Sequence, residues 1–127
     1  MTLAYVCLLI AGLLPLVATG VAKKGFEGYD NHNPRAWLAQ QTGHRARAIA
    51  AEANSLEAFP FFAASLLAAI QTGVAASTVN ALAFVFVVAR LAYLYCYVSD
   101  RATLRSLVWA VGYVCVLALG VLAILAA

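Results

Sequence analysis

The stretch Glu52–Phe62, EANSLEAFPFF, places two acids, an amide and a proline inside an otherwise apolar run. Asn54 and Glu57 are three residues apart, so on an α-helix their side chains share one face. A carboxylate within a membrane-spanning helix is costly, and it is usually paired or turned toward the interior of a bundle. This stretch therefore predicts a transmembrane helix with one polar face that other helices must cover.

The composition on either side of this stretch is that of a membrane protein. Of the 127 residues, 65% are hydrophobic and 10% are charged, whereas a soluble domain has an apolar share of about 45–50%. The net charge is only +3, and there is no basic patch of the kind that nucleic acid requires, so we expect no nucleic-acid partner. Cys7, Cys96 and Cys115 lie far apart, which predicts buried thiols and neither a disulfide framework nor a metal site.

Four apolar segments are each long enough to cross a hydrocarbon core of ~30 Å. The first has no positive charge before it, and Lys23 and Lys24 follow it, which favours a retained span over a signal peptide. We predict an all-α integral membrane four-helix bundle with up-down topology, in one domain over residues 1–127. The predicted spans are residues 2–22, 44–71, 74–98 and 102–126.

The only long polar stretch is residues 23–43. Within it, Asn33 followed by Pro34 is typical of a helix N-cap and first helical position. This favours a short surface helix over residues 35–41, ended by Gly43, although a plain linker is an equal alternative. Basic residues flank this connection and the one at residues 99–101, while the connection around residues 71–78 carries no charge. The positive-inside rule then predicts that these two connections are cytoplasmic and that both termini are outside.

Counting residues along the helices places two charges at similar depth. Glu57 lies twelve residues beyond Arg45, roughly 18 Å along the helix axis, and Arg90 lies ten residues before Asp100, roughly 15 Å. On adjacent antiparallel helices the two charges would meet, so we predict a buried ion pair between Glu57 and Arg90. Such a pair either fixes helix register alone or also binds a ligand.

Other polar residues share this membrane level and predict one cluster in the cytoplasmic half of the bundle. Tyr93 and Tyr97 could instead be interfacial aromatics, and Asn54 could simply bond across helices. Arg105 is harder to explain structurally, because the helix dipole disfavours a cation at a helix start. A cation beside the Ser106 hydroxyl suits an anion such as a thiolate or carboxylate. The predicted cluster is Arg47, Asn54, Glu57, Arg90, Tyr93, Tyr97, Arg105 and Ser106.

Three motifs in this cluster resemble the signatures of the MAPEG superfamily, the membrane-associated proteins in eicosanoid and glutathione metabolism. The resemblance covers residues 33–109, and the four-span layout extends it to the whole chain. The stretches before the second span (residues 33–43) and after the third (residues 100–109) are similar to those of bacterial members, which implies a bacterial inner membrane. The three motifs are Asn54-x-x-Glu57-x-x-Pro60, Arg90-x-x-Tyr93-x-x-x-Tyr97 and Arg105-Ser106.

The resemblance implies a homotrimer that binds glutathione as co-substrate between subunits. By the same resemblance, Asn54, Glu57, Arg90, Tyr93 and Tyr97 hold the tripeptide. Relatives that use glutathione carry an arginine where this chain has Ala50, and Arg47 is the candidate to replace it.

The implied catalytic residues are Arg105, which stabilises the glutathione thiolate, and Ser106 as its helper. The resemblance thus implies a glutathione-dependent transferase or peroxidase, whose thiolate attacks a lipophilic electrophile that arrives through the bilayer. One alternative is a non-catalytic family member that binds a lipid or a partner protein. A second is a proton-coupled exporter built around Glu57, which the arginine at equal depth disfavours.

Overall fold

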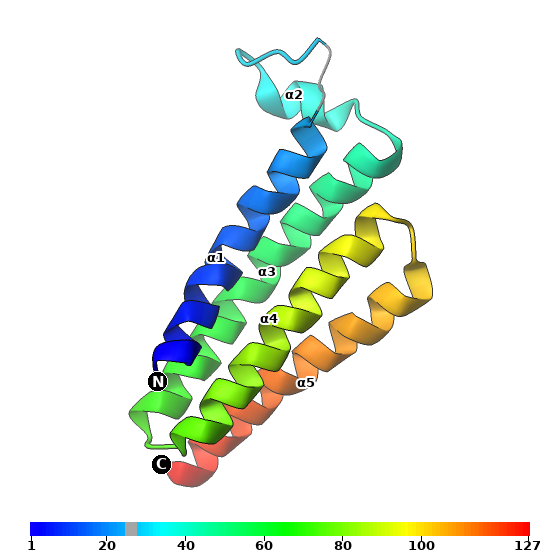
Figure 1. Cartoon of the computed structure of the whole chain (residues 1–127). Helices are drawn as coiled ribbons and strands as arrows, with labels where there is room; N and C mark the ends of the chain where they lie inside the picture. Colours follow the sequence, from blue (N-terminus) through cyan, green and yellow to red (C-terminus); the bar gives the residue numbers. More distant parts are fainter. Residues whose placement is uncertain (25–27) are drawn as a thin grey trace.

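The computed structural model describes residues 1–24 and 28–127, and in this part of the chain all the regular structure is helical (Figure 1). Four helices are long and apolar enough to cross a membrane, which confirms the all-α, four-span prediction. The fifth, α2, is a short helix between the first two spans. The elements are α1 (Thr2–Lys23), α2 (Pro34–Ala39), α3 (Gly43–Gln71), α4 (Ala76–Val98) and α5 (Ala102–Ala126).

The four long helices alternate in direction along the bundle. Figure 1 shows the N- and C-termini at the same end, with the turn between α3 and α4, while α2 lies at the opposite end. The most extensive contacts join α4 with α5 and α1 with α3, and α3 also packs against α4 and α5. The α3, α4 and α5 helices therefore surround a common space, and the predicted site residues come from these three helices.

The core combines small, aliphatic and aromatic residues, and Phe62, Leu66 and Leu119 are among its largest fully buried side chains. Phe62 of α3 stacks on Phe86 of α4, with ring centroids 3.9 Å apart. Buried alanines such as Ala4, Ala69 and Ala83 let the helix backbones approach closely, as small residues do in membrane bundles. Many other large apolar side chains are exposed on the outer surface. This surface fits a hydrocarbon solvent and would be an aggregation hazard in water.

The connection before α3 follows the sequence prediction in one respect and departs from it in another. Asn33 is the N-cap of α2 and Pro34 is its first residue, as predicted. However, α2 ends at Ala39, and Gly43 begins α3 instead of ending α2. Gly43 has φ +61°, a conformation that glycine adopts without steric cost, so it redirects the chain into the membrane span.

The turn before α2 is held by Asp30. Its carboxylate accepts hydrogen bonds from the Asn33 side chain at 3.1 Å and from the His32 backbone N–H at 2.9 Å. The Asn33 bond is the main cause, and the His32 bond a further cause, of a lowered pKa of the Asp30 carboxyl. The Asp30 side chain thus accepts a hydrogen bond from the backbone two residues later, which is a common arrangement in turns.

Candidate functional site

Arg90 is the buried charge at the centre of the site. Its side chain is 4% exposed, and its Nη2 donates hydrogen bonds to Asn54 Oδ1 at 2.8 Å and to Ser55 Oγ at 3.4 Å. Ser55 was not among the predicted site residues. The amide and the hydroxyl are neutral, so they orient the guanidinium without neutralising it.

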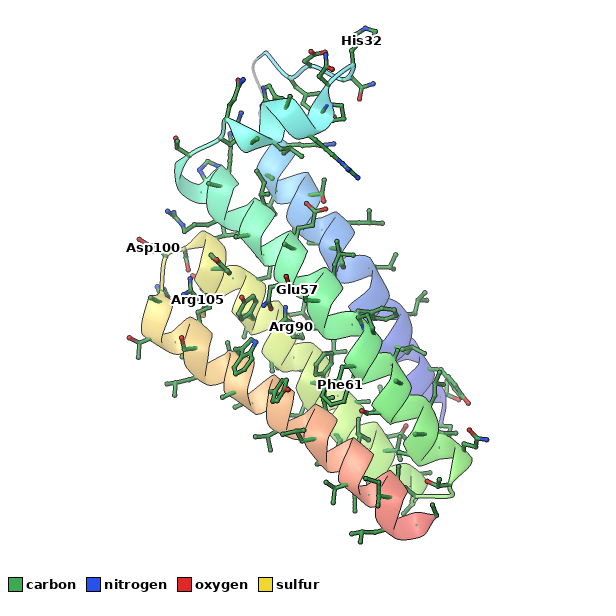
Figure 2. All side chains as sticks on the ribbon, turned by 180° about the vertical axis from the view of Figure 1, so that it is seen from behind. His32, Glu57, Phe61, Arg90, Asp100 and Arg105 are labelled. Atoms are coloured by element: carbon green, nitrogen blue, oxygen red, sulfur yellow. The ribbon has the colours of Figure 1, made fainter. Side chains whose placement is uncertain are left out.

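The predicted ion pair between Glu57 and Arg90 is wrong. Within the described part of the chain, Arg90 has no carboxylate partner, and Glu57 is exposed on the single subunit. Counting residues gave the correct depth, since the two side chains lie on facing helices at the same level (Figure 2). Counting residues does not determine how each helix is rotated about its axis. In the structure it is Asn54, one turn from Glu57, that points at the guanidinium.

Two arginines and two tyrosines form a continuous series, which we call the arginine–tyrosine ladder. The Arg90 guanidinium carbon lies 4.2 Å from the centroid of the Tyr93 ring. Tyr93 meets Tyr97 edge to face, at 5.6 Å between centroids and 82° between planes. The Arg105 guanidinium carbon lies 4.3 Å from the centroid of the Tyr97 ring. The structure thus brings together four of the predicted residues through two cation–π contacts and one contact between aromatic rings.

Arg105 ends this ladder with its hydrogen-bond donors unused. It lies in the first turn of α5 and is half-buried, and its side chain forms no hydrogen bond or ion pair with the described residues. Ser106, the next residue, is exposed. A guanidinium held by one ring face keeps its N–H groups available for an anion.

A cavity of about 170 Å³ lies between α3, α4 and α5. Three predicted residues, Asn54, Glu57 and Arg90, form its polar side. Figure 2 shows Phe61 farther than Glu57 and Arg90 from the connection between α4 and α5. The remaining lining residues were not predicted from the sequence: Ala58, Phe61, Phe86, Trp109, Gly112, Tyr113 and Val116.

A sequence signal for two of these missed residues exists. Trp109 lies four residues after Arg105, and Tyr113 four residues after Trp109, so all three lie along one stripe of α5. The missed pattern is therefore a helical stripe that begins at a predicted site residue. Phe61 and Phe86 carry no comparable signal, because phenylalanine is common throughout apolar spans.

Arg47 does not line this cavity. Its Nε and Nη2 donate hydrogen bonds to the carbonyl oxygen of Val98 at 3.3 Å and 3.1 Å. Val98 is the last residue of α4, where unpaired carbonyls and the helix dipole both favour a cation. Arg47 therefore joins α3 to the end of α4, next to Tyr97.

The described residues contain no group of three or more His, Cys, Asp and Glu side chains that could hold a metal ion. The cavity instead combines a buried cation, a carboxylate and aromatic rings. No curated protein and no solved structure matches the chain. The sequence model of the MAPEG family matches residues 2–125, nearly the whole chain. The chain is therefore an integral membrane protein that belongs to the MAPEG family.

Proposed function

We propose that this protein is a membrane-embedded, glutathione-dependent transferase or peroxidase. The observation that carries the proposal is the buried Arg90 cation, which borders a cavity and has no carboxylate partner in the described structure. An uncompensated buried charge costs several kcal/mol, so an anion in the cavity would stabilise it. The MAPEG family includes glutathione transferases and peroxidases, and its members generally use glutathione.

Glutathione suits the mixed charges of the cavity. Its carboxylates would bind the guanidinium of Arg90, and its ammonium group would bind the carboxylate of Glu57. Asn54 supports this arrangement through its 2.8 Å hydrogen bond to Arg90. Tyr93 and Tyr97 would provide the wall between the two arginines, since both belong to the arginine–tyrosine ladder.

Arg105 would stabilise the thiolate, with the Ser106 hydroxyl as a second donor. A thiol with a pKa of about 8.5 is mostly protonated at neutral pH, and each unit of lowering corresponds to about 1.36 kcal/mol. In a transferase reaction the sulfur forms a bond to the electrophilic carbon of a lipophilic substrate. In a peroxidase reaction two thiols are oxidised to a disulfide while a hydroperoxide is reduced to an alcohol and water.

The exposure of Glu57 supports an assembly larger than one chain. A carboxylate that faces lipid in the middle of a span is costly, and Glu57 is exposed on the single subunit. We propose that a neighbouring copy covers this side of the site in a homotrimer, as is usual among MAPEG proteins. The end of the bundle that carries α2 would face the cytoplasm, and both termini the opposite side.

Arg47 would act at a distance from the ligand. Its two hydrogen bonds to Val98 hold the end of α4, which positions Tyr97 beneath Arg105. This role differs from direct binding in place of an arginine at the Ala50 position.

The proposal is tested with purified protein in detergent or nanodiscs. Glutathione binding is measured by calorimetry, and conjugation is measured with 1-chloro-2,4-dinitrobenzene. We expect saturable binding, and a rate at least tenfold lower for Arg105→Ala because the thiolate loses its cation. Arg101→Ala is the matched control, since Arg101 is a nearby cation that stacks on the exposed Tyr95, and its rate should stay within twofold of wild type. Absence of saturable glutathione binding to the wild type would overturn the proposal.

A further inference from the structure

The net positive charge of the chain is confined to one segment, residues 23–47. This segment carries five Lys or Arg residues against two acids, Glu27 and Asp30. The other charged residues of the chain are three acids and three arginines, which balance, so the formal charge of +3 belongs to this segment. The connection around residues 71–78, at the opposite end of the bundle in Figure 1, carries no charge. The bundle therefore has one strongly basic end.

Three of these cations lie where the first span ends. Lys23 is the last residue of α1, which carries no other charged side chain, and Lys24 follows it. Nη1 of Arg45, on α3, donates a hydrogen bond to the carbonyl oxygen of Ala22 at 2.9 Å. This bond places Arg45 at the same level as the two lysines. Basic residues that border an apolar span in this way lie at the level of the lipid headgroups.

Aromatic rings connect these cations to α2. Nζ of Lys23 lies 4.8 Å from the centroid of the Tyr29 ring. Tyr29 meets Trp37 of α2 edge to face, at 5.0 Å between centroids and 88° between planes. The guanidinium carbon of Arg45 lies 5.8 Å from the centroid of the Trp37 ring. Together with the bond from Arg45 to Ala22, these contacts form a closed circuit that joins α1, α2 and α3.

Helix α2 is too short to be stable through its own hydrogen bonds. It has six residues, and none of them is buried, whereas isolated helices shorter than about 12 residues are marginal in water. Its Trp37 and Leu38 are half-buried. Tryptophan and tyrosine concentrate at the membrane–water interface, because their rings are apolar and their N–H or O–H groups are polar. The short helix therefore suits the plane of the lipid headgroups.

Three exposed or half-buried cations at this end have no acid as a partner. Within residues 1–24 and 28–127, the side chains of Lys23, Lys24 and Arg35 form no ion pair. The described acid of the segment is Asp30, and its carboxylate already accepts a hydrogen bond from the Asn33 side chain at 3.1 Å. We call Lys23, Lys24 and Arg35 the basic surface. Its charges are available to anions outside the chain.

We propose that the basic surface docks onto the headgroups of anionic phospholipids, with Tyr29 and Trp37 seated at the membrane interface. Phosphate oxygens accept charge-assisted hydrogen bonds from ammonium and guanidinium groups. Each Lys or Arg near an anionic bilayer surface strengthens binding by a factor of roughly five. Phosphatidylcholine carries the same phosphate with a cation of its own, so it would compete poorly. The bound lipids would hold α2 across the ends of α1 and α3.

This docking surface lies apart from the cavity, and the proposal does not depend on the proposed function. No residue of α1 or α2 lines the cavity. Arg45 lies nine residues before Asn54, roughly 14 Å along the axis of α3 and half a turn around it. Arg45 accordingly bonds α1, whereas Asn54 bonds Arg90 of α4. A neighbouring copy that covers Glu57 would meet α3, α4 and α5, which leaves the end of α1 to the lipid.

Trp37 itself can report the contact. The chain has two tryptophans, so Trp109→Phe leaves Trp37 as the one that fluoresces. This protein is reconstituted into mixed bilayers of phosphatidylglycerol and phosphatidylcholine, in which one or the other lipid has brominated acyl chains that quench nearby tryptophan. We expect Trp37 to prefer phosphatidylglycerol at least fivefold at an ionic strength of about 0.05 M. The preference should fall below twofold at about 0.5 M, because salt screens the charges.

Two triple variants in the same background separate charge from side-chain packing. Lys23→Gln/Lys24→Gln/Arg35→Gln removes the three charges, and we expect its preference for phosphatidylglycerol to fall below twofold. The matched control, Lys23→Arg/Lys24→Arg/Arg35→Lys, keeps every charge and should stay within twofold of the background protein. The glutathione Kd of both variants should stay within threefold of that protein. If the glutamine variant does not fold, the salt series decides the result.

A soluble anion is the competing occupant of the basic surface. Inorganic phosphate and glutathione are therefore each added at constant ionic strength, and neither should change the lipid preference more than twofold. Displacement of phosphatidylglycerol by either anion would overturn the lipid assignment. A background protein without lipid preference, or a preference that survives in the glutamine variant, would overturn the docking surface. Failure to bind glutathione would overturn the proposed function and leave this proposal standing.

Discussion

At the scale of single residues, the site depends on a buried arginine that is oriented by neutral groups. Asn54 and Ser55 hold the Arg90 guanidinium by hydrogen bonds, and Tyr93 lies against its face. None of the three carries a negative charge that would compete with an anionic ligand. Arg90 is therefore a fixed cation whose charge remains to be neutralised.

Replacing this cation by an apolar side chain of similar length should separate binding from folding. We expect Arg90→Met to weaken glutathione binding on the order of 100-fold, since breaking one partner of a buried charge pair costs about 2–5 kcal/mol. Calorimetric titration measures the effect, and Arg101→Met is the exposed control. Unchanged affinity in a folded Arg90→Met protein would show that the ligand does not meet this cation.

The sequence predicted the residues of this centre better than their contacts. Hydropathy and residue counting placed Asn54, Glu57 and Arg90 at one level, because helical rise is regular. Hydropathy and residue counting led to a wrong ion pair, because the contacts of a side chain also depend on the rotation of its helix about the axis and on side-chain length. The sequence did not predict the cation–π contacts of Tyr93 and Tyr97 for the same reason. Only the structure shows that these contacts form one series.

At the scale of helices, the end of α4 is held by a cation from α3. The two hydrogen bonds from Arg47 to the Val98 carbonyl satisfy an acceptor that the helix itself leaves unpaired. The ladder residues Tyr93 and Tyr97 lie within the last turns of α4. The Arg47 contact therefore fixes the register of the ladder against α3.

Removing this contact should affect stability more than ligand binding. We expect Arg47→Ala to lower the free energy of unfolding by about 1.5–3 kcal/mol, the range for hydrogen bonds to charged groups. Arg47→Lys keeps the positive charge but lacks the two-pronged guanidinium, so it should recover part of the lost free energy of unfolding. Thermal unfolding in detergent and calorimetry with glutathione are measured together, and a Kd change below threefold is expected. A tenfold loss of affinity without loss of stability would instead indicate direct contact with the ligand.

The helices themselves were largely predictable from the sequence, whereas the aromatic residues that line the cavity were not. Long apolar runs between charged connections are a strong signal for spans, and the structure places helices over those runs. Phe61, Phe86 and Trp109 are apolar residues within apolar helices, so hydropathy does not distinguish the residues that line a cavity from those that face lipid. Only the packing of α3, α4 and α5 separates them.

At the scale of the whole molecule, one chain leaves its site open on one side. Glu57 is exposed although it lies within a span. The same is true of three aromatic residues that line the cavity, Phe61, Trp109 and Tyr113. Assembly would cover the carboxylate and complete the cavity. Native mass spectrometry from detergent should therefore give a mass three times the 13.4 kDa of one chain. A monomer that retains full conjugation activity would contradict a shared site.

Under the proposed function, the thiolate of bound glutathione forms only when three features act together. These are the Arg90 cation, the arginine–tyrosine ladder that ends at Arg105, and the assembled cavity. Thiolate formation is measured as the ultraviolet thiolate band that develops when glutathione is titrated into wild-type protein and into Arg105→Ala near neutral pH. We predict a saturable thiolate signal with the wild type, with proton release to the buffer, and a signal reduced at least tenfold in Arg105→Ala. Wild-type protein that gives no saturable thiolate signal, or an Arg105→Ala protein that gives the same signal as wild type, would contradict the proposed activation of glutathione.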